Sequence, residues 1–188
     1  MSFMTAADFE ARYCADPDPW DYLASDYERD KYAKTLAACG AGPFACALEL
    51  GGSIGVFSEL LVPRCKRLLT VDVSPTAVGQ ARARLAAHPH AEAIVGSIPT
   101  AVPEARFDLV VASEILYYLS DEQLARTLAL LERSMVPRAL LVAVHWRPPG
   151  PERPRDAETA HAALRGASWL TQVHEGGTED YLLEVFRG

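Results

Sequence analysis

The sequence has no apolar run long enough to cross a lipid bilayer, so we expect no membrane-spanning helix. Residues Met1–Asp8 lack both the basic region and the apolar stretch of a secretory leader. Internal repeats, low-complexity segments and interdomain linkers are also missing. These absences exclude membrane and repeat proteins, and they predict one cytoplasmic domain over residues 1–188.

Positive charge is scarce in this chain. Its 18 Lys and Arg residues are outnumbered by 25 Asp and Glu residues, which gives a net charge of −7 and a pI near 5.2. A protein that binds nucleic acid needs a basic face for the phosphates, so we expect no nucleic-acid partner. A small-molecule partner suits this acidic chain better. The sequence leaves the oligomeric state open.

Cysteine and histidine are few, and they are not spaced as metal ligands. The four cysteines form no Cys-x-x-Cys pair, and we expect them to be reduced, structural thiols. The five histidines lack the spacing and the neighbouring acids or cysteines that a metal site needs. We therefore expect no metal ion.

What the chain does contain is a regular alternation of short apolar runs and helix-length segments. Cap residues mark the helix starts: Ser25 and Ser120 show the capping-box spacing, and Ser74-Pro75 pairs a cap with a proline at the first helical position. We expect helices at residues 5–14, 25–39, 54–61, 74–87, 120–135 and 157–164, and strands at residues 44–50, 67–73, 91–96, 107–113 and 139–146. This order predicts a parallel sheet built from βαβ units.

The last part of the chain changes character. Residues 147–156 hold four prolines and predict an irregular, charged loop. Residues 169–174 and 181–186 flank Glu175-Gly176-Gly177-Thr178, which predicts a β-hairpin. An antiparallel final strand would complete a seven-stranded, mostly parallel α/β sheet within residues 44–188, while residues 1–43 would form N-terminal cap helices.

The most informative stretch is Glu49-Leu50-Gly51-Gly52-Ser53-Ile54-Gly55, where a buried strand runs into a glycine turn that starts a helix. Glycine takes positive φ freely and lets backbone N–H groups approach a ligand. Asp72 ends the next apolar run, 23 positions after Glu49, where a carboxylate can accept both hydroxyls of a ribose. Together these features predict a site for a nucleoside cofactor.

The detail of the turn distinguishes between cofactors. A dinucleotide site needs G-x-G-x-x-G, whereas this turn reads E-x-G-G-S-x-G. The pattern resembles the turn of class I S-adenosylmethionine methyltransferases, with Ser53 at the position of the middle glycine. We therefore expect S-adenosyl-L-methionine as the cofactor, and neither NAD nor ATP. The resemblance implies a Rossmann-like fold with an antiparallel C-terminal hairpin strand and N-terminal lid helices.

Over nearly its whole length the chain also resembles the nodulation protein S family of S-adenosylmethionine-dependent N-methyltransferases. The resemblance lies in Asp18-Pro19-Trp20, Ser25, Tyr27-Glu28, Lys31-Tyr32, Thr35-Leu36, Ser113–Leu119 and His145-Trp146-Arg147. Known members of the family methylate the free amine of a deacetylated chitooligosaccharide, which implies an oligosaccharide or a related small amine as substrate. The family's usual Gly-Asp after the third strand is Gly96-Ser97 here, so the adenine amine would meet a hydroxyl instead of an acid.

The expected cofactor pocket combines the glycine turn with the ends of neighbouring elements. Its expected residues are Trp20, Lys31, Glu49, Gly51, Gly52, Ser53, Gly55, Asp72, Val73, Ser97, Ile98 and Ser113. Trp20 can cover the sulfonium, because an aromatic face attracts positive charge, and Lys31 can reach the methionine carboxylate. A Trp20 packed under the first helix and a solvated Lys31 are the alternatives.

Glu114 and His145 are the candidate acid–base groups, with Tyr118 as a third catalytic candidate. Glu114 and His145 both lie at the carboxyl ends of expected parallel strands, where open α/β sheets bind ligands. Either residue can hold an attacking amine or take its proton. A solvent-facing or helix-starting Glu114 and a packed, hydrogen-bonded His145 are the alternatives.

Substrate contacts are expected from Tyr117, Tyr118, Trp146, Arg147 and His161. Adjacent tyrosines can shape a pocket and offer hydroxyls to a sugar, although such a pair occurs equally as core plus surface. The proline-rich loop and the Trp20 segment are expected to flank the same mouth of the sheet. An O-methyltransferase of a small phenolic or polyketide metabolite and a cofactor-binding protein without catalysis are the alternative functions.

Overall fold

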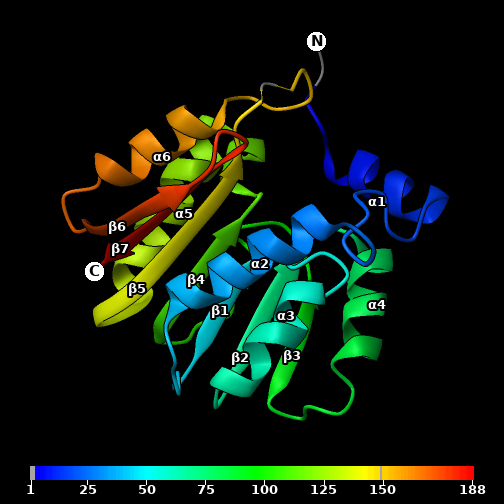
Figure 1. Cartoon of the computed structure of the whole chain (residues 1–188), viewed down its shortest axis with the longest axis horizontal. Coiled ribbons are helices and arrows are strands. Elements are labelled where there is room, and N and C mark those ends of the chain that lie inside the picture. The colour runs from blue at the N-terminus through cyan, green and yellow to red at the C-terminus, as the bar shows by residue number, and fades with distance from the viewer. Residues whose placement is uncertain (1–2, 149) are drawn as a thin grey trace.

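The computed structural model describes residues 3–148 and 150–188, and its centre is a seven-stranded sheet in the order β3-β2-β1-β4-β5-β7-β6 (Figure 1). The strands are β1 (Ala47–Leu50), β2 (Leu68–Asp72), β3 (Ala91–Val95), β4 (Phe107–Ser113), β5 (Met135–Trp146), β6 (Thr171–Gly177) and β7 (Tyr181–Arg187). The first five pair in parallel, and β7 is antiparallel to both β5 and β6. This confirms the expected mostly parallel sheet with a C-terminal antiparallel hairpin.

In the described part of the chain, six helices connect and cover these strands. They are α1 (Ala6–Ala15), α2 (Asp26–Cys39), α3 (Val56–Leu61), α4 (Pro75–Arg84), α5 (Asp121–Ser134) and α6 (Ala157–Arg165), with short 3₁₀ turns η1 (Val62–Arg64) and η2 (Leu116–Tyr118). Ser74 caps α4 and a complete capping box starts α5, as the sequence predicts. At α2 only the Ser25 half of the box forms, because the Glu28 side chain bonds Lys31 instead.

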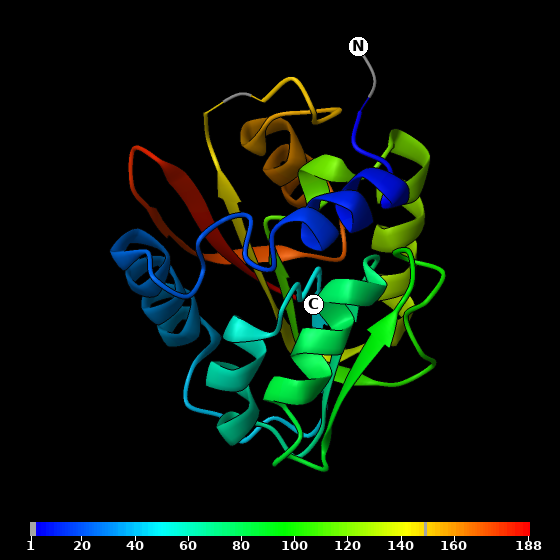
Figure 2. The ribbon, with the colours of Figure 1, turned by 90° about the vertical axis from the view of Figure 1, so that its right-hand side faces the viewer.

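Successive side chains of each central strand point to opposite faces, and both faces are buried. On one face Leu48, Val110 and Leu141 pack with residues of α5 and α6. On the other face Ala47 and Val111 pack with residues of α2 and α3. Figures 1 and 2 show helices on both sides of the sheet, so the ligand-binding edge is left at the strand ends.

Several boundaries differ from the sequence-based expectation. Strand β1 starts at Ala47, because Phe44 makes only an isolated bridge to Cys65. Helix α3 starts at Val56, because the glycine turn extends to Gly55. Strand β5 starts at Met135, directly after α5, since its first residue already pairs with Phe107 of β4. The hairpin turn lies at residues 178–180, because pairing with β7 continues to the end of β6.

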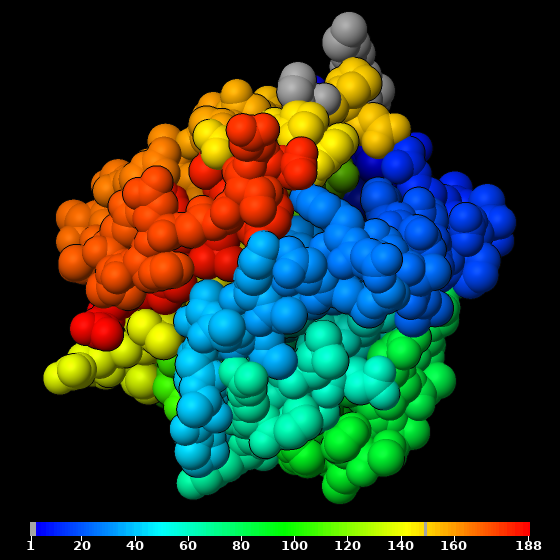
Figure 3. Space-filling model, in the orientation of Figure 1, coloured from blue at the N-terminus to red at the C-terminus, as the bar shows by residue number. Residues whose placement is uncertain are grey.

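The N-terminal segment crosses the strand-end edge of the sheet. Helix α1 packs against α4, while α2 packs against α3, β5 and β7. Figure 3 shows the two helices as a blue band across the molecule, with residues 147–148 and 150–156 of the loop after β5 above it. The Met4 amide donates to the Glu152 carbonyl (3.0 Å), and Arg12 forms an ion pair with Glu152 (2.7 Å). Within the described residues, no helix is long and apolar enough to span a membrane.

Candidate active site

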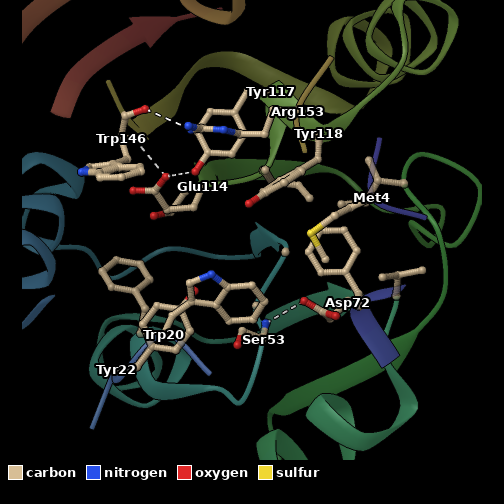
Figure 4. Close-up of a pocket in the computed structure, with 18 of the residues that line it drawn as sticks. Met4, Trp20, Tyr22, Ser53, Asp72, Glu114, Tyr117, Tyr118, Trp146 and Arg153 are labelled. Atoms are coloured by element: carbon tan, nitrogen blue, oxygen red, sulfur yellow. Dashed lines mark hydrogen bonds between the residues drawn. The ribbon is translucent and has the colours of Figure 1, made fainter. Parts of the chain in front are cut away.

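A cavity of about 980 Å³ opens at the carboxyl ends of the parallel strands. Figure 4 shows its two sides: Trp20, Ser53 and Asp72 lie across from Glu114 and Trp146. Both the Trp20 segment and the proline-rich loop contribute to the lining, the latter through Gly150, Glu152 and Arg153. The two segments therefore flank one mouth, as the sequence predicts.

The glycine turn after β1 forms the floor of one side. A Cβ on Gly52 would collide with the Thr70 hydroxyl and lie 3.2 Å from Glu49 Oε2. Gly55 has a φ of 80°, and a Cβ there would lie 2.9 Å from Cα of Ala81 on α4. Any larger residue at these two positions would collide with its neighbours, so both require glycine. Gly51 and Gly52 also line the cavity, which exposes the backbone of the turn to it. Gly55 supports the turn from behind and does not line the cavity itself.

Glu49 lies beneath this turn and is buried. Its Oε2 accepts a hydrogen bond from the Ser58 hydroxyl of α3. Burial raises the pKa of Glu49 to about 7, against the opposing effect of the Ser58 hydrogen bond. Glu49 therefore joins the turn to α3 from below, and its contact with a ligand is limited to the cavity floor.

Asp72 holds the other side of the turn. Its two oxygens accept the amides of Ser53 and Ser74, both at 2.9 Å, and each oxygen keeps a lone pair for a ribose hydroxyl. Burial raises the pKa of Asp72, while these backbone bonds lower it. The Ser53 hydroxyl bonds the Tyr13 hydroxyl of α1. The serine that replaces a glycine of the motif thus ties the lid helix to the turn.

Glu114 is the polar centre of the opposite side. Its Oε1 accepts from Lys31 Nζ (2.8 Å), and its Oε2 accepts the Tyr117 hydroxyl and the Trp146 amide (3.0 Å). The residue has a φ of 56°, in the left-handed region that side chains rarely adopt. Three donors fix this carboxylate, and one lone pair of Oε1 is left toward the cavity.

Lys31 is buried between two carboxylates. Besides Glu114, its ammonium donates to Glu28 Oε1 (2.9 Å). Although burial alone would lower the pKa of Lys31, the two glutamates raise it, so the amine stays charged. Glu28 Oε2 is buried and has no hydrogen-bond partner among the residues described, and burial raises the pKa of this carboxyl. Lys31 retains one N–H for the carboxylate of a cofactor.

Aromatic rings and one arginine complete the walls. Trp20 packs on Tyr13 of α1, with ring centroids 5.3 Å apart, and also lines the cavity, while its contact with the sulfonium stays a prediction. Arg153 lies over the Tyr117 ring at 4.4 Å and over the Trp146 ring at 5.5 Å. The loop after β5 is thereby attached to the side of the cavity on which Glu114 lies.

His145 and His161 lie in the interior, between the sheet and α6, and neither lines the cavity. His145 accepts the Leu116 amide at Nε2 (3.0 Å), and its Nδ1 lies 3.0 Å from His161 Nε2. Burial first, and then neighbouring positive charge, lowers the pKa of His145 well below its usual value. The geometry therefore favours the packed, hydrogen-bonded interpretation of His145 over contact with an acceptor.

The structure brings most of the sequence-predicted residues to one cavity. Those that line it are Trp20, Lys31, Glu49, Gly51, Gly52, Ser53, Asp72, Val73, Ser97, Ile98, Ser113, Glu114, Tyr117, Tyr118 and Trp146. Arg147 points elsewhere, since its guanidinium pairs with Glu158 (2.9 Å). Sequence reasoning missed Phe9, Tyr13, Tyr22, Tyr27, Glu28, Arg153 and Asp180. Among these, Tyr27 and Glu28 lie in a segment that carries the family resemblance, and the spacing of Glu28 from Ser25 predicts a helix cap for it.

The parallel sheet, the glycine turn after β1, the acid after β2 and the lid helices define a class I S-adenosylmethionine-dependent methyltransferase. The residues fit that cofactor: the turn presents backbone, Asp72 has free acceptor capacity, and Lys31 has a spare N–H. Within the described residues, no group of three His, Cys, Asp or Glu side chains is arranged to hold a metal ion.

Comparisons with known proteins agree with this class. The family model of nodulation protein S matches residues 5–136. Nodulation protein S of Rhizobium tropici is 34% identical over 187 residues, which covers 94% of this chain and 78% of that protein. The protein of the same name from Sinorhizobium fredii is 38% identical over 117 residues, so the chain spans about half (54%) of its length. The chain belongs to the nodulation protein S family.

A solved structure extends the match to the whole fold. The N-methyltransferase NodS of Bradyrhizobium japonicum WM9, crystallised with S-adenosyl-L-homocysteine, superposes with a TM-score of 0.87. That comparison covers 98% of this chain and 99% of the other, at 31% sequence identity. The lid helices and the C-terminal hairpin therefore lie within the matched region.

Proposed function

We propose that this protein transfers the methyl group of S-adenosylmethionine to the free amino group of an amino sugar, either within an oligosaccharide or as a small molecule. The observation that carries the proposal is the Glu114 carboxylate, which lies across the cavity from the glycine turn and keeps one acceptor site toward the cavity. The N-methyltransferase activity named for the Bradyrhizobium relative supports an amine as acceptor.

The residues present suit an amine better than a neutral hydroxyl. The cofactor, when bound, supplies a methyl group on a positively charged sulfur. An amine must be neutral to attack it, so an ammonium has to give up a proton first. Glu114 Oε1 can accept a hydrogen bond from an N–H of the substrate amine and take that proton. The lone pair of the amine nitrogen is then free to face the methyl group. Water or Glu114 then carries the proton away.

The neighbours of Glu114 keep it in position for this task. Lys31, Tyr117 and the Trp146 amide prevent the carboxylate from rotating. Trp146, a residue that is 42% exposed, offers the apolar face of its ring beside that carboxylate, and sugar rings pack on such faces. Holding the amine between this side and the glycine turn is chiefly a matter of positioning.

The proposal is tested with labelled S-adenosylmethionine and a panel of acceptors. Deacetylated chitooligosaccharides and free glucosamine are the amine arms, their N-acetylated counterparts are matched controls, and a simple phenol tests O-methylation. We expect label only in the amine arms, on nitrogen by mass spectrometry. Equal transfer to the acetylated sugars, or transfer to the phenol alone, contradicts the proposal.

We place the reaction in the cytoplasm. Four free cysteines, three of them buried, support a compartment in which thiols stay reduced. Fractionation of the native cells, with the protein detected by antibody, tests this placement.

A further inference from the structure

Three buried side chains form a continuous hydrogen-bonded chain behind the active site. His145 on β5 contacts His161 on α6, and His161 Nδ1 lies 2.6 Å from Glu184 Oε2 on β7. Glu184 Oε1 also accepts from Arg165 (2.6 Å) and Gln172 (3.0 Å). His145 and His161 have no exposed surface. The chain begins at the Leu116 amide of η2, beside the cavity, and none of its side chains belongs to the methyl-transfer site proposed above.

The Leu116 amide determines where every proton in this chain lies. Because a backbone N–H only donates, His145 Nε2 must be an unprotonated acceptor, and the proton of His145 must be on Nδ1. His145 then donates to His161 Nε2, which leaves the His161 proton on Nδ1, facing Glu184. Both rings are neutral in this arrangement. Any added proton would leave two donors facing each other at one of the links.

The segment held by this chain carries the groups that position Glu114. The Tyr117 hydroxyl donates to Glu114, and the Tyr117 ring packs against the His145 ring with centroids 4.9 Å apart. The carbonyls of Leu116 and Leu119 accept from Arg155 on the far side of η2. Among the described amides of η2, only that of Leu116 bonds a side chain, and this side chain is His145. Leu116 is the first residue of η2, three positions after the end of β4.

We propose that His145, whose tautomer is fixed by the Leu116 amide and whose Nδ1 proton is accepted by His161, is a positioning residue that holds η2 so that Tyr117 orients the Glu114 carboxylate. The inference rests on the proposed methyl transfer only for its kinetic consequence. The arrangement of protons and the anchoring of η2 are properties of the folded protein without an acceptor. His145 acts through Leu116 and Tyr117 and does not touch the substrate.

The tautomers are tested on the unmodified protein by ¹⁵N NMR of labelled histidine. We expect both buried rings in the neutral tautomer with the proton on Nδ1, as the hydrogen-bond donors around them require. A His145 proton on Nε2, or a charged imidazolium at either buried ring, overturns the proposal. This measurement needs neither a substrate nor a variant.

Two substitutions distinguish the roles of the two ring nitrogens of His145. His145→Gln puts an amide oxygen near the position of Nε2 and can still accept from Leu116, whereas His145→Asn places its amide near Nδ1 and loses that contact. We expect hydrogen exchange of the Leu116 amide to accelerate about 100-fold or more in H145N and much less in H145Q. His174→Asn, on the exposed strand β6, is the matched control. Equal exchange in H145N and H145Q refutes the anchoring role.

Kinetics then connect the anchor to turnover. With a confirmed acceptor, we expect H145N to lower kcat/KM for that acceptor roughly tenfold or more, as for a lost hydrogen bond, with unchanged cofactor affinity. H145Q is expected to recover most of this loss. A uniform loss of cofactor binding and turnover in both variants would mean a merely structural role. If no acceptor is methylated, the proposed function fails while the NMR and exchange results still decide the inference.

Discussion

Glu114 has an unusual backbone conformation for a residue with a side chain. A left-handed conformation costs roughly 1–2 kcal/mol in an L-residue, and it is retained where surrounding contacts outweigh it. Here the amide of Glu114 donates to the Val144 carbonyl (2.8 Å), while its carboxylate accepts three donors. The strain turns the side chain away from β4 and into the cavity, where the proposed acceptor amine would lie.

This placement predicts a specific kinetic result for Glu114→Gln. The amide keeps the shape but cannot take a proton, so turnover should fall by roughly 100-fold or more. Cofactor affinity, measured by calorimetry, should stay nearly unchanged. Raising the pH should partly restore the rate, because more of the acceptor amine is then already neutral. A variant that turns over at the wild-type rate removes Glu114 from the mechanism.

Asp72 combines two tasks, and two substitutions distinguish them. Asp72→Asn keeps one acceptor oxygen and can still accept one of the two amides, that of Ser53 or that of Ser74, whereas Asp72→Ala releases both. Losing charged hydrogen bonds to the ribose should weaken cofactor binding by about 1.5–3 kcal/mol in D72A, with a smaller effect in D72N. Titration calorimetry with S-adenosylhomocysteine measures both. Normal binding by D72A excludes Asp72 as the ribose acid.

Individual residues show how far the sequence leads. Glu114, Asp72 and Trp146 could be predicted, because strand ends in parallel sheets face a common edge. His145 stands at such an end too, but the pleat directs it to the α6 face with Leu141 and Ala143. Neighbouring residues of a strand point to opposite faces, so Trp146 lines the cavity whereas His145, one position before it, lies in the interior.

At the scale of elements, local sequence signals predict where helices begin better than they predict which contacts the lid makes. Caps at Ser74 and Ser120 act within four residues, so the sequence shows them directly. The contacts of Glu28 and Arg153 depend on how α2 and the proline-rich loop pack across the sheet. Such long-range partners leave no mark in a single sequence. The early start of β5 has the same origin, since pairing with β4 decides it.

The link between α1 and the glycine turn leads to a prediction about the lid. Tyr13→Phe removes the hydroxyl that bonds Ser53, while the ring contact with Trp20 remains. We expect amide exchange in α1 to speed up several-fold and cofactor affinity to fall by about 0.5–1.5 kcal/mol, the scale of one neutral hydrogen bond.

Ser53→Gly is the matched partner, because it removes the same bond and also relieves the left-handed φ of 51° at that position. It should therefore loosen α1 as Y13F does and disturb the turn less than the substitution of a larger residue. Exchange mass spectrometry of α1 peptides in both variants provides the comparison. Unchanged exchange in both variants would show that the hydroxyl pair does not hold the lid.

For the whole molecule, buried acids and buried histidine act on stability in opposite directions as pH changes. Burial raises the pKa of Glu49 from 4.5 to about 7, so the folded state holds a proton that the unfolded state releases. Stability from this group is therefore full below about pH 4.5 and declines as pH rises toward 7. The pKa of His145 is lowered in the folded protein, so below pH 6.5, the ordinary pKa of histidine, the unfolded state binds a proton that the folded state does not. The contribution of His145 to stability therefore rises with pH.

A substitution at Glu49 isolates one of these two effects. Glu49→Gln can still accept the Ser58 hydroxyl but cannot ionise, so the decline between pH 4.5 and 7 that Glu49 causes should disappear. The full difference amounts to about 3 kcal/mol, from 1.36 kcal/mol per pH unit. His145 contributes equally to both proteins and cancels in the comparison. Urea unfolding at pH 5, 6, 7 and 8 measures it: E49Q should gain stability relative to wild type as pH rises. Parallel stability curves for the two proteins would mean that Glu49 is already ionised in the folded state at pH 5, with its carboxylate solvated or paired by groups other than Ser58.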